Sequence, residues 1–342
     1  MDKTISSRFL AQKELFDSHG YFKLICGAGN EDLEEVRRLS MIYTLSGATG
    51  MDISATPSVV KACMEGIDRA YEISHKLKKE IKIRPFIMVS VGMPGDHHVR
   101  KAFIDPDLCI MCGLCVDPVC PTDAIDWGGA KTLAVVNQPK CIGCGDCSAI
   151  CPKPDIISYV HNEKGLEEIL PECIELGAEN IELHAAVLDD EPVLHEWEIV
   201  NNINPFGFNS VCLDRGYLSN HGIKTRIQKM LEICPDRMIV QADGIPMAGG
   251  QDDYRTTLQA VACADIVDKF AFPVFILLSG GTNSLSIELS KKCSVPYAGV
   301  SIGTYARHLI YEYINDPKFP EKSILDAAVN KAKLLVGTCF AE

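Results

Sequence analysis

Two cysteine-rich segments lie close together between residues 109 and 152, and they constrain the fold more than any other feature of this chain. Each has three cysteines at two-residue spacing and a fourth cysteine followed by proline. This spacing lets three thiolates of one tight loop reach one iron–sulfur cluster, and in two-cluster ferredoxins the fourth cysteine binds the other cluster. The sequence therefore predicts two [4Fe–4S] clusters. The predicted ligands are Cys109, Cys112, Cys115 and Cys151 for one cluster, and Cys141, Cys144, Cys147 and Cys120 for the other.

The spacing departs from the usual pattern at one point, because four residues rather than three separate Cys115 from Cys120. Since Cys120 is assigned to the other cluster, the extra residue lengthens a connection without removing a ligand. Repeated C-x-x-C pairs are also typical of zinc sites. Two interlocked sets of four cysteines, each closed by a Cys-Pro pair, favour iron–sulfur clusters over a pair of zinc knuckles.

The rest of the composition describes a globular protein with a large domain besides the cysteine-rich one. The chain has 342 residues, of which 47% are hydrophobic and 23% charged. A net charge of −13 without a basic block argues against binding to nucleic acid or to anionic membranes. No signal peptide or membrane-spanning apolar run is recognisable, so we expect the sixteen cysteines to lie in the reducing cytoplasm.

Outside the cysteine-rich region, strand-like segments alternate with helix-like ones. Strands are expected over residues 21–26, 48–54, 85–91, 180–185, 209–214, 238–243, 273–278 and 297–302. Eight such units predict a (β/α)₈ barrel, a fold of typically about 250 residues. The cysteine-rich domain interrupts the barrel after the third strand, which divides the chain into residues 1–98, 99–161 and 162–342. The alternative is an open doubly wound sheet, suggested by Gly27-Ala28-Gly29, but the third glycine of a dinucleotide motif is missing.

Polar residues gather where the expected strands end. In such barrels the active site lies at the carboxyl ends of the strands, and period-two alternation turns these side chains towards the mouth. The candidate catalytic residues are Asp52, Glu182, His184, Asp214 and Asp243, with Gln241 beside them as a candidate cofactor ligand. The alternative interpretation is that these side chains only solvate the rim. Cys26 and Cys212 could also line the pocket, although strand alternation makes core packing the safer interpretation of both.

The loops after the last two strands are rich in glycine. Phosphate sites in these barrels are often built from these two loops and a helix N-terminus, where backbone N–H groups and the helix dipole favour an anion. The predicted binding residues are Gly280, Gly281, Asn283, Gly303 and Thr304, and the ligand could be FMN or another phosphorylated molecule. Alternatively, Gly280 and Gly281 only form a tight turn.

Several longer runs carry a family resemblance. F-K-L-I-C-G-A, Y-T-L-S-G-A-T-G-M-D-I-S-A, Q-A-D-G-I-P-M-A-G-G, S-G-G-T-N and G-V-S-I-G-T-Y-A-R together resemble the light-dependent period protein (LdpA) family. The resemblance implies an iron–sulfur protein that reports redox state to the circadian clock of photosynthetic bacteria. The positions that match the Q-A-D-G and S-G-G-T-N motifs are Gln241, Asp243, Gly244, Gly280, Gly281 and Asn283. The resemblance implies no particular enzymatic reaction.

Two functions follow from these observations. In the first, the chain passes electrons between a redox partner protein and a ligand at the barrel mouth, alone or as a subunit of a larger complex. In the second, it is a regulatory protein whose cluster redox state controls partner binding. The insertion follows the carboxyl end of the third strand through the short connection of residues 93–100, so we expect the clusters to cap or flank the mouth.

Overall fold

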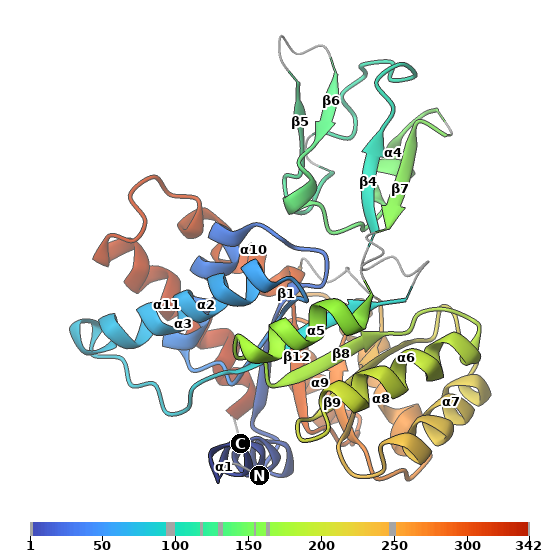
Figure 1. Cartoon of the computed structure of the whole chain (residues 1–342). Helices are drawn as coiled ribbons and strands as arrows, with labels where there is room; N and C mark the ends of the chain where they lie inside the picture. Colours follow the sequence, from blue (N-terminus) through green and yellow to red (C-terminus); the bar gives the residue numbers. More distant parts are fainter. Residues whose placement is uncertain are drawn as a thin grey trace.

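A computed structural model describes residues 3–93, 100–116, 119–128, 133–153, 155–161, 165–245 and 251–340. Eight parallel strands form a closed barrel, which confirms the predicted fold (Figure 1). In spatial order they are β1 (Tyr21–Gly27), β2 (Gly50–Ser54), β3 (Phe86–Gly92), β8 (Asn180–His184), β9 (Asn209–Asp214), β10 (Met238–Asp243), β11 (Phe275–Ser279) and β12 (Gly299–Ile302). Closure brings β1 beside β12, two strands from opposite ends of the chain.

Helices follow the strands and surround the barrel (Figure 1). They are α2 (Leu33–Ser46), α3 (Pro57–Leu77), α5 (Leu166–Glu175), α6 (Asp190–Ile203), α7 (Asn220–Ile233), α8 (Tyr254–Asp268), α9 (Ser286–Lys292), α10 (Thr304–Ile314) and α11 (Lys322–Gly337). Local sequence fixes several of their starts. The carboxylate of Asp32 accepts hydrogen bonds from the backbone of Glu34 and Glu35, and Ser219 caps α7 through the backbone N–H of Gly222. Short 3₁₀ turns lie at Gln138–Lys140 and Thr338–Phe340.

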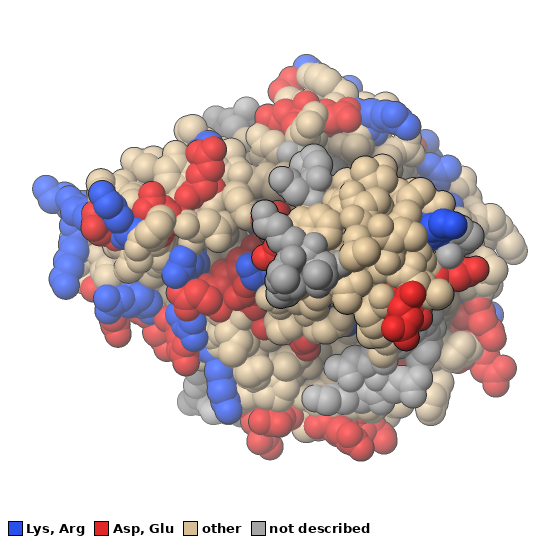
Figure 2. Space-filling model, turned by 90° about the horizontal axis from the view of Figure 1, so that it is seen from above, with Lys and Arg blue, Asp and Glu red and all other residues tan. Residues whose placement is uncertain are grey.

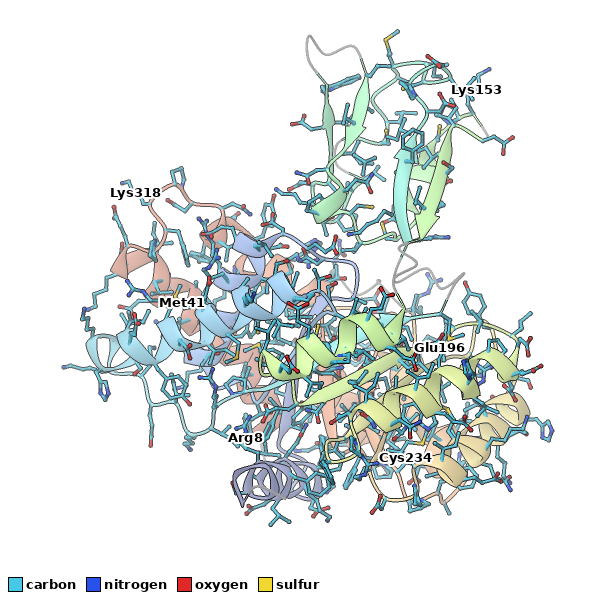
Figure 3. All side chains as sticks on the ribbon, viewed as in Figure 1. Arg8, Met41, Lys153, Glu196, Cys234 and Lys318 are labelled. Carbon is cyan, nitrogen blue, oxygen red and sulfur yellow. The ribbon has the colours of Figure 1, made fainter. Side chains whose placement is uncertain are left out.

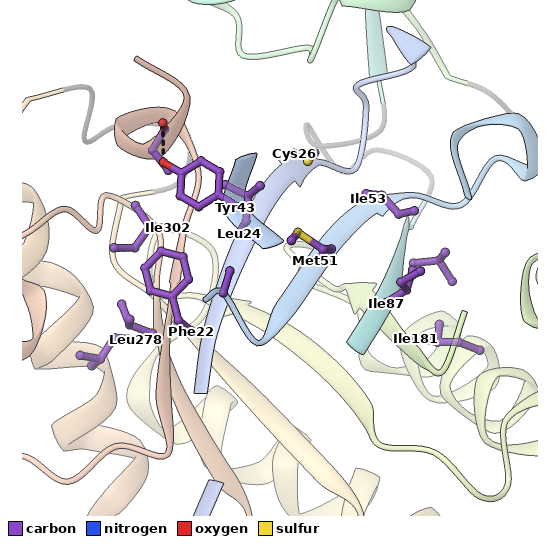
Figure 4. Packing of buried hydrophobic residues seen from close by; sticks show 14 of the residues in the cluster. Phe22, Leu24, Cys26, Tyr43, Met51, Ile53, Ile87, Ile181, Leu278 and Ile302 are labelled. Atoms are coloured by element: carbon purple, nitrogen blue, oxygen red, sulfur yellow. Dashed lines mark hydrogen bonds between the residues drawn. The ribbon is translucent and has the colours of Figure 1, made fainter. Parts of the chain in front are cut away.

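The main hydrophobic core lies between the strands and the helices. Phe22, Leu24, Met51 and Ile53 point outwards from β1 and β2, and they pack with residues of the neighbouring strands and helices (Figure 4). The hydroxyl of Tyr43 in α2 donates to the backbone oxygen of Ala306, at 2.8 Å. Because side chains alternate along a strand, the intervening residues of each strand face the barrel axis. The fold therefore directs a second set of side chains into the barrel interior.

Apolar side chains pack together at the amino-terminal end of the barrel. Helix α1 (Lys3–Asp17) lies across this end, and the ring of Phe9 stacks on that of Phe208 with 4.3 Å between centroids. Phe16 packs against Tyr21 in the same cluster. Arg8, which lies at this end (Figure 3), makes two hydrogen bonds of 2.6 and 2.7 Å to the carboxylate of Glu179. Apolar side chains thus fill the barrel axis at its amino-terminal end.

The inserted domain rises above the carboxyl end of the barrel, between β3 and α5 (Figure 1). Its base is an antiparallel pair, β4 (Arg100–Ile104) with β7 (Ile157–His161), and a second pair joins β5 (Ile125–Trp127) to β6 (Ala134–Val136). A short helix, α4 (Asp146–Ile150), lies within the second cysteine segment and includes Cys147. Residues 94–99 of the entering connection, and residues 117–118 of the lengthened one, lie outside the described part of the chain.

Contacts with the loop between β1 and α2 hold the inserted domain at the mouth. Lys101 donates to the backbone oxygens of Gly29 in the barrel and Cys141 in the insertion, the latter at 2.9 Å. The backbone N–H of Glu31 donates to Pro139 O at 2.8 Å, and Tyr311 in α10 hydrogen-bonds Asp123. These contacts place the insertion where the sequence led us to expect it. No helix of the described residues is long and apolar enough to cross a membrane.

Candidate functional site

A buried lysine stands at the centre of the barrel. Lys23 points inwards from β1, its side chain is fully buried, and its ammonium lies 2.6 Å from a carboxylate oxygen of both Asp52 and Glu182. Ser90 donates to the other oxygen of Asp52. The three charged residues come from β1, β2 and β8, strands that only barrel closure brings around one axis.

Neutral side chains complete this network on the opposite side. The amide nitrogen of Gln241 donates to Glu182 Oε2 at 2.6 Å, and the hydroxyl of Ser301 donates to Gln241 Oε1 at 2.9 Å. Gln241 also donates to Ser210 at 3.3 Å. Glu182 Oε2 therefore accepts hydrogen bonds from both Lys23 and Gln241. This double restraint fixes the carboxylate and leaves its other oxygen, Oε1, facing the mouth.

Electrostatics keep the lysine charged. Burial alone would lower the pKa of Lys23, but the carboxylates of Asp52 and Glu182 outweigh it and raise the pKa above its usual value. Burial raises the pKa of Asp52, and the nearby Glu182 raises it further against the opposing effect of Lys23. An amine must be neutral to act as a nucleophile, so this environment does not suit Lys23 to Schiff-base chemistry. It suits the lysine to holding two acids in place.

A small cavity lies directly above the network. Its volume is about 90 Å³, and its floor includes Glu182, with His184 Nε2 3.4 Å from Glu182 Oε1. The thiol of Cys212 on β9 donates to the carboxylate of Asp243 on β10. One further lining residue, Ile142, belongs to the inserted domain and sits between two of the predicted cluster ligands. The cavity is therefore built jointly by the barrel and the insertion.

The eight predicted cluster cysteines fall into two spatial groups. Burial raises the pKa of the Cys115 thiol, and its thiol neighbours that add to this effect are Cys112, Cys109 and Cys151. Burial raises the pKa of Cys144 to about 12, with contributions from Cys120 and Cys147. A second small cavity is lined by Cys120, Cys141, Cys144 and Cys147. The fourth cysteine of each segment thus lies with the other segment's three, which is the arrangement that two cubane clusters require.

Backbone donors already point at two of these sulfurs. Ala102 N lies 3.3 Å from Cys141 Sγ, and Ala124 N lies 3.2 Å from Cys120 Sγ. Hydrogen bonds to ligand sulfurs are among the features that set the reduction potential of an iron–sulfur cluster. The residues present therefore fit such a cofactor.

Comparison with known proteins shows which family the chain belongs to. A profile of the light dependent period A C-terminal domain matches residues 174–338, and a profile of the 4Fe-4S dicluster domain matches residues 102–159. The chain is 30% identical over 339 residues to light dependent period A of Synechococcus elongatus, an alignment that covers 95% of this chain and 92% of that protein. The chain belongs to the light dependent period A family.

Other similarities concern parts of the chain or its fold. Ferredoxin-3 of a Nostoc species is 35% identical over 75 residues, which cover 17% of this chain and 74% of that protein. A probable oxidoreductase of Bacillus subtilis is 29% identical over 168 residues, covering 44% of this chain but 16% of that protein. Among solved structures, an aldolase from Escherichia coli K12 has a TM-score of 0.44 at 9% identity, covering 94% of this chain and 90% of that one. The inserted domain thus makes this family member an iron–sulfur protein of the ferredoxin type.

The structure brings together most of the predicted mouth residues. Glu182, His184, Asp243, Gly280, Gly281, Gly303 and Thr304 all line the cavity. Asp52 and Gln241 lie one layer deeper, inside the buried network. Asp214, also predicted as catalytic, lies at the end of β9, and its Oδ1 accepts from Gly216 N of its own loop at 2.6 Å. The predicted residues therefore occupy three different environments.

The glycine-rich loop after β11 has a structural explanation of its own. Gly280 and Gly281 have φ values of +64° and +80°, and a Cβ at Gly280 would lie 2.9 Å from the backbone nitrogen of Gly244. The amide of Asn283 donates to the backbone oxygens of Gln251 and Asp253, so it braces the loop. Residues 246–250 of the Q-A-D-G-I-P-M-A-G-G run lie outside the described residues.

The comparisons and the cavity give no support to FMN. Neither matching profile nor any of the relatives above is named for a flavin. A cavity of about 90 Å³ is also well below the roughly 300–1,000 Å³ of pockets that hold drug-sized ligands.

Sequence reasoning missed Lys23. The residue is the one charged position in the apolar run Y-F-K-L-I-C, and a charge inside a buried strand is a recognisable signal for a paired or functional group. Its partners could not be named in advance, because Asp52 and Glu182 are 29 and 159 residues away along the chain.

Proposed function

We propose that this protein relays electrons between a redox partner and the mouth of its barrel through two [4Fe–4S] clusters. The outer cluster would be held by Cys109, Cys112, Cys115 and Cys151, and the inner cluster by Cys120, Cys141, Cys144 and Cys147. Each cluster supplies a site that gains and loses one electron. The chain's own contribution is to set the position, hydrogen bonding and burial of the two sites.

The observation that carries this proposal is the contact of the inner site with the mouth. Cys141 is buried, its backbone oxygen accepts from Lys101, and the same ammonium also binds Gly29 O on the barrel. Its neighbour Ile142 lines the cavity that contains Glu182 and Asp243. The residue that follows the cluster ligand Cys141 would therefore contact the same cavity as Glu182 and Asp243, so an electron on the inner cluster would lie close to the groups at the mouth.

The outer site is the natural place for a partner to dock. Cys112 is exposed, and around the outer cysteines lies an exposed apolar patch. The patch consists of Leu108, Ile110, Met111, Leu114 and Ile150. Figure 2, which looks down on the inserted domain, shows a broad area with few Lys, Arg, Asp or Glu residues. Weak electron-transfer encounters use small interfaces of this kind. The partner would be a redox protein with a matching apolar surface.

Anaerobic cluster analysis and a redox titration test the relay. About eight iron and eight sulfide per chain are expected, with two one-electron steps. Cys112→Ser should impair one step more than the other, and Cys293→Ser, which removes an exposed cysteine outside both groups, should leave both steps intact. Stoichiometric zinc without sulfide would contradict the proposal.

A second function, redox sensing, is favoured by the family and by the hydrogen bonds of Lys101, Glu31 and Tyr311 that join the two domains. In that case a change in cluster charge would alter the contact made by Lys101, Glu31 and Tyr311. Hydrogen exchange of the oxidised and reduced protein separates the two functions. A relay keeps the protection of residues 28–32 unchanged, whereas a sensor changes it on reduction.

A further inference from the structure

Three side chains of different chemistry meet at the floor of the mouth cavity. One ligand atom from each of Glu182, His184 and Cys212 lies within 4.8 Å of the other two, and all three residues are buried. Two features of the sheet produce this grouping. Glu182 and His184 are two residues apart on β8, so they share its inner face, and the register between β8 and β9 pairs His184 directly with Cys212.

The charges around this group favour a cation. Among the described residues, the ammonium of Lys23 pairs with the carboxylates of Asp52 and Glu182, and a third carboxylate, that of Asp243, accepts a hydrogen bond from Cys212. Arg307 lines another part of the cavity, but it is paired with Glu35 at 2.9 Å. Buried carboxylates are costly unless they are paired or bind a metal. Carboxylates from three strands, β2, β8 and β10, thus lie around the group of Glu182, His184 and Cys212.

The geometry of Glu182 matches that of a restrained metal ligand. Its Oε2 is held by Lys23 and Gln241 at 2.6 Å each, and its Oε1 lies on the side of His184. Metal-binding carboxylates are typically oriented in this way by outer hydrogen bonds. The network below the cavity thus fixes the oxygen that a metal would contact.

We propose that Glu182, His184 and Cys212 bind one divalent transition metal ion of borderline softness, Zn²⁺ or Fe²⁺, at the barrel mouth. An imidazole, a thiolate and a carboxylate together suit this class of ion, whereas Mg²⁺ and Ca²⁺ prefer oxygen ligands alone. Binding converts the thiol of Cys212 into a thiolate. The proton is released through Asp243, which already accepts it in a hydrogen bond, to solvent.

Three protein ligands leave a fourth position open towards the cavity. Sites of this kind are typical of metals that act on a bound water or substrate, whereas structural zinc sites use four protein ligands. The cavity of about 90 Å³ has room for a few water molecules or a very small ligand at that position. This metal site shares no residue with the two cluster sites, and the proposal does not depend on the electron relay.

Zinc binding to the full chain, with both clusters loaded anaerobically, tests the site. After dialysis against Zn²⁺ and removal of excess metal, one zinc per chain is expected without loss of iron or sulfide. Zinc-edge X-ray absorption should show one sulfur at about 2.3 Å together with nitrogen and oxygen at about 2.0–2.2 Å. Cys212→Ser should remove the sulfur and weaken binding at least about tenfold, and His184→Gln should weaken it similarly while keeping the sulfur.

Cys26→Ser is the matched control, because Cys26 is a second buried thiol that lines the same cavity and lies outside the group of three. This variant should keep both the zinc and its sulfur ligand. Absence of stoichiometric zinc in the wild-type protein would overturn the proposal, as would zinc that displaces cluster iron. A sulfur ligand that persists in Cys212→Ser, or disappears in Cys26→Ser, would also overturn it.

Discussion

The barrel and the inserted domain differ in what holds them together. The barrel has a continuous core that runs from β1 round to α11, and each fully buried Leu, Val or Ile in it contributes about 1.5–3 kcal/mol of burial free energy. Among its described residues, the insertion has a core cluster of nine buried residues, and two of them are the predicted cluster ligands Cys141 and Cys147. A single core in a domain below about 70–80 residues rarely supplies more than a few kcal/mol, and small domains often add a metal site. We therefore expect packing to stabilise the barrel and bound cofactors to stabilise the insertion.

The barrel and the insertion also differ in the partners of their charged and thiol side chains. In the barrel the charged side chains of Lys23, Asp52 and Glu182 satisfy one another, whereas in the insertion we propose that eight thiols bind groups that come from outside the chain. Removal of the clusters should therefore affect only the insertion. Removal of one charge from the buried network should affect only the barrel.

Loss of the clusters should have the largest effect. Treatment with an iron chelator under oxidising conditions is expected to unfold the insertion, because its small core cannot offset the chain entropy without the metal sites. Hydrogen exchange should then become fast over residues 100–161, while the barrel strands stay protected. Equal loss of protection in both parts would show that the barrel also needs the clusters.

Alkylation of thiols gives an independent measure of the same difference. In cluster-free protein the eight cysteines of the insertion should react with iodoacetamide. The barrel thiols Cys63 and Cys263 should not react, because burial raises the pKa of each to about 12. Cys293 is exposed and should react with and without clusters, which makes it the internal standard.

The sequence predicts the strands of the barrel better than the contacts between the side chains inside it. Strand–helix alternation was sufficient to predict eight strands, and β9 and β10 have the predicted ends at Asp214 and Asp243. Alternation also shows which residues share a face, as for Glu182 and His184. It does not show which strands become neighbours or in what register. The pairing of His184 with Cys212 depends on the register between β8 and β9, and the meeting of Lys23 with two distant acids depends on the closed barrel, so both required the structure.

Lys23→Met should produce the second largest effect, and it should be confined to the barrel. The substitution leaves Asp52 and Glu182 buried without a counter-charge, which typically costs about 3–5 kcal/mol. Urea unfolding of cluster-loaded protein can be followed by the fluorescence of Trp197, which is buried in the barrel, in a Trp127→Phe background that removes the signal from the insertion.

A triple variant separates charge from packing at this position. Lys23→Met combined with Asp52→Asn and Glu182→Gln removes all three charges, so most of the lost stability should return. If the triple variant is no more stable than Lys23→Met, loss of the lysine's packing rather than of its charge would explain the destabilisation. In either case the iron content of the insertion should stay at the wild-type level, since the network does not contact the cluster cysteines through any bond in the described residues.

The smallest effect should come from Asp190→Asn at the start of α6, where the barrel's stability depends on pH. The carboxylate of Asp190 lies 2.7 Å from the buried Arg226 and 2.9 Å from Lys229. Burial opposes its ionisation, but hydrogen bonds from Lys229 and Arg226 outweigh this and lower the pKa of Asp190. A lowered pKa means that the ionised form stabilises the fold above the unfolded pKa of about 3.9, and that this contribution disappears as the pH falls through the folded pKa.

Asp190→Asn should therefore cost about 1–2 kcal/mol at pH 7, and the difference from wild type should shrink below about pH 4. Urea titrations of the two proteins at pH 7, 5 and 3.5 measure this difference, and a constant difference across that range would show that Asp190 acts through packing and not through its charge.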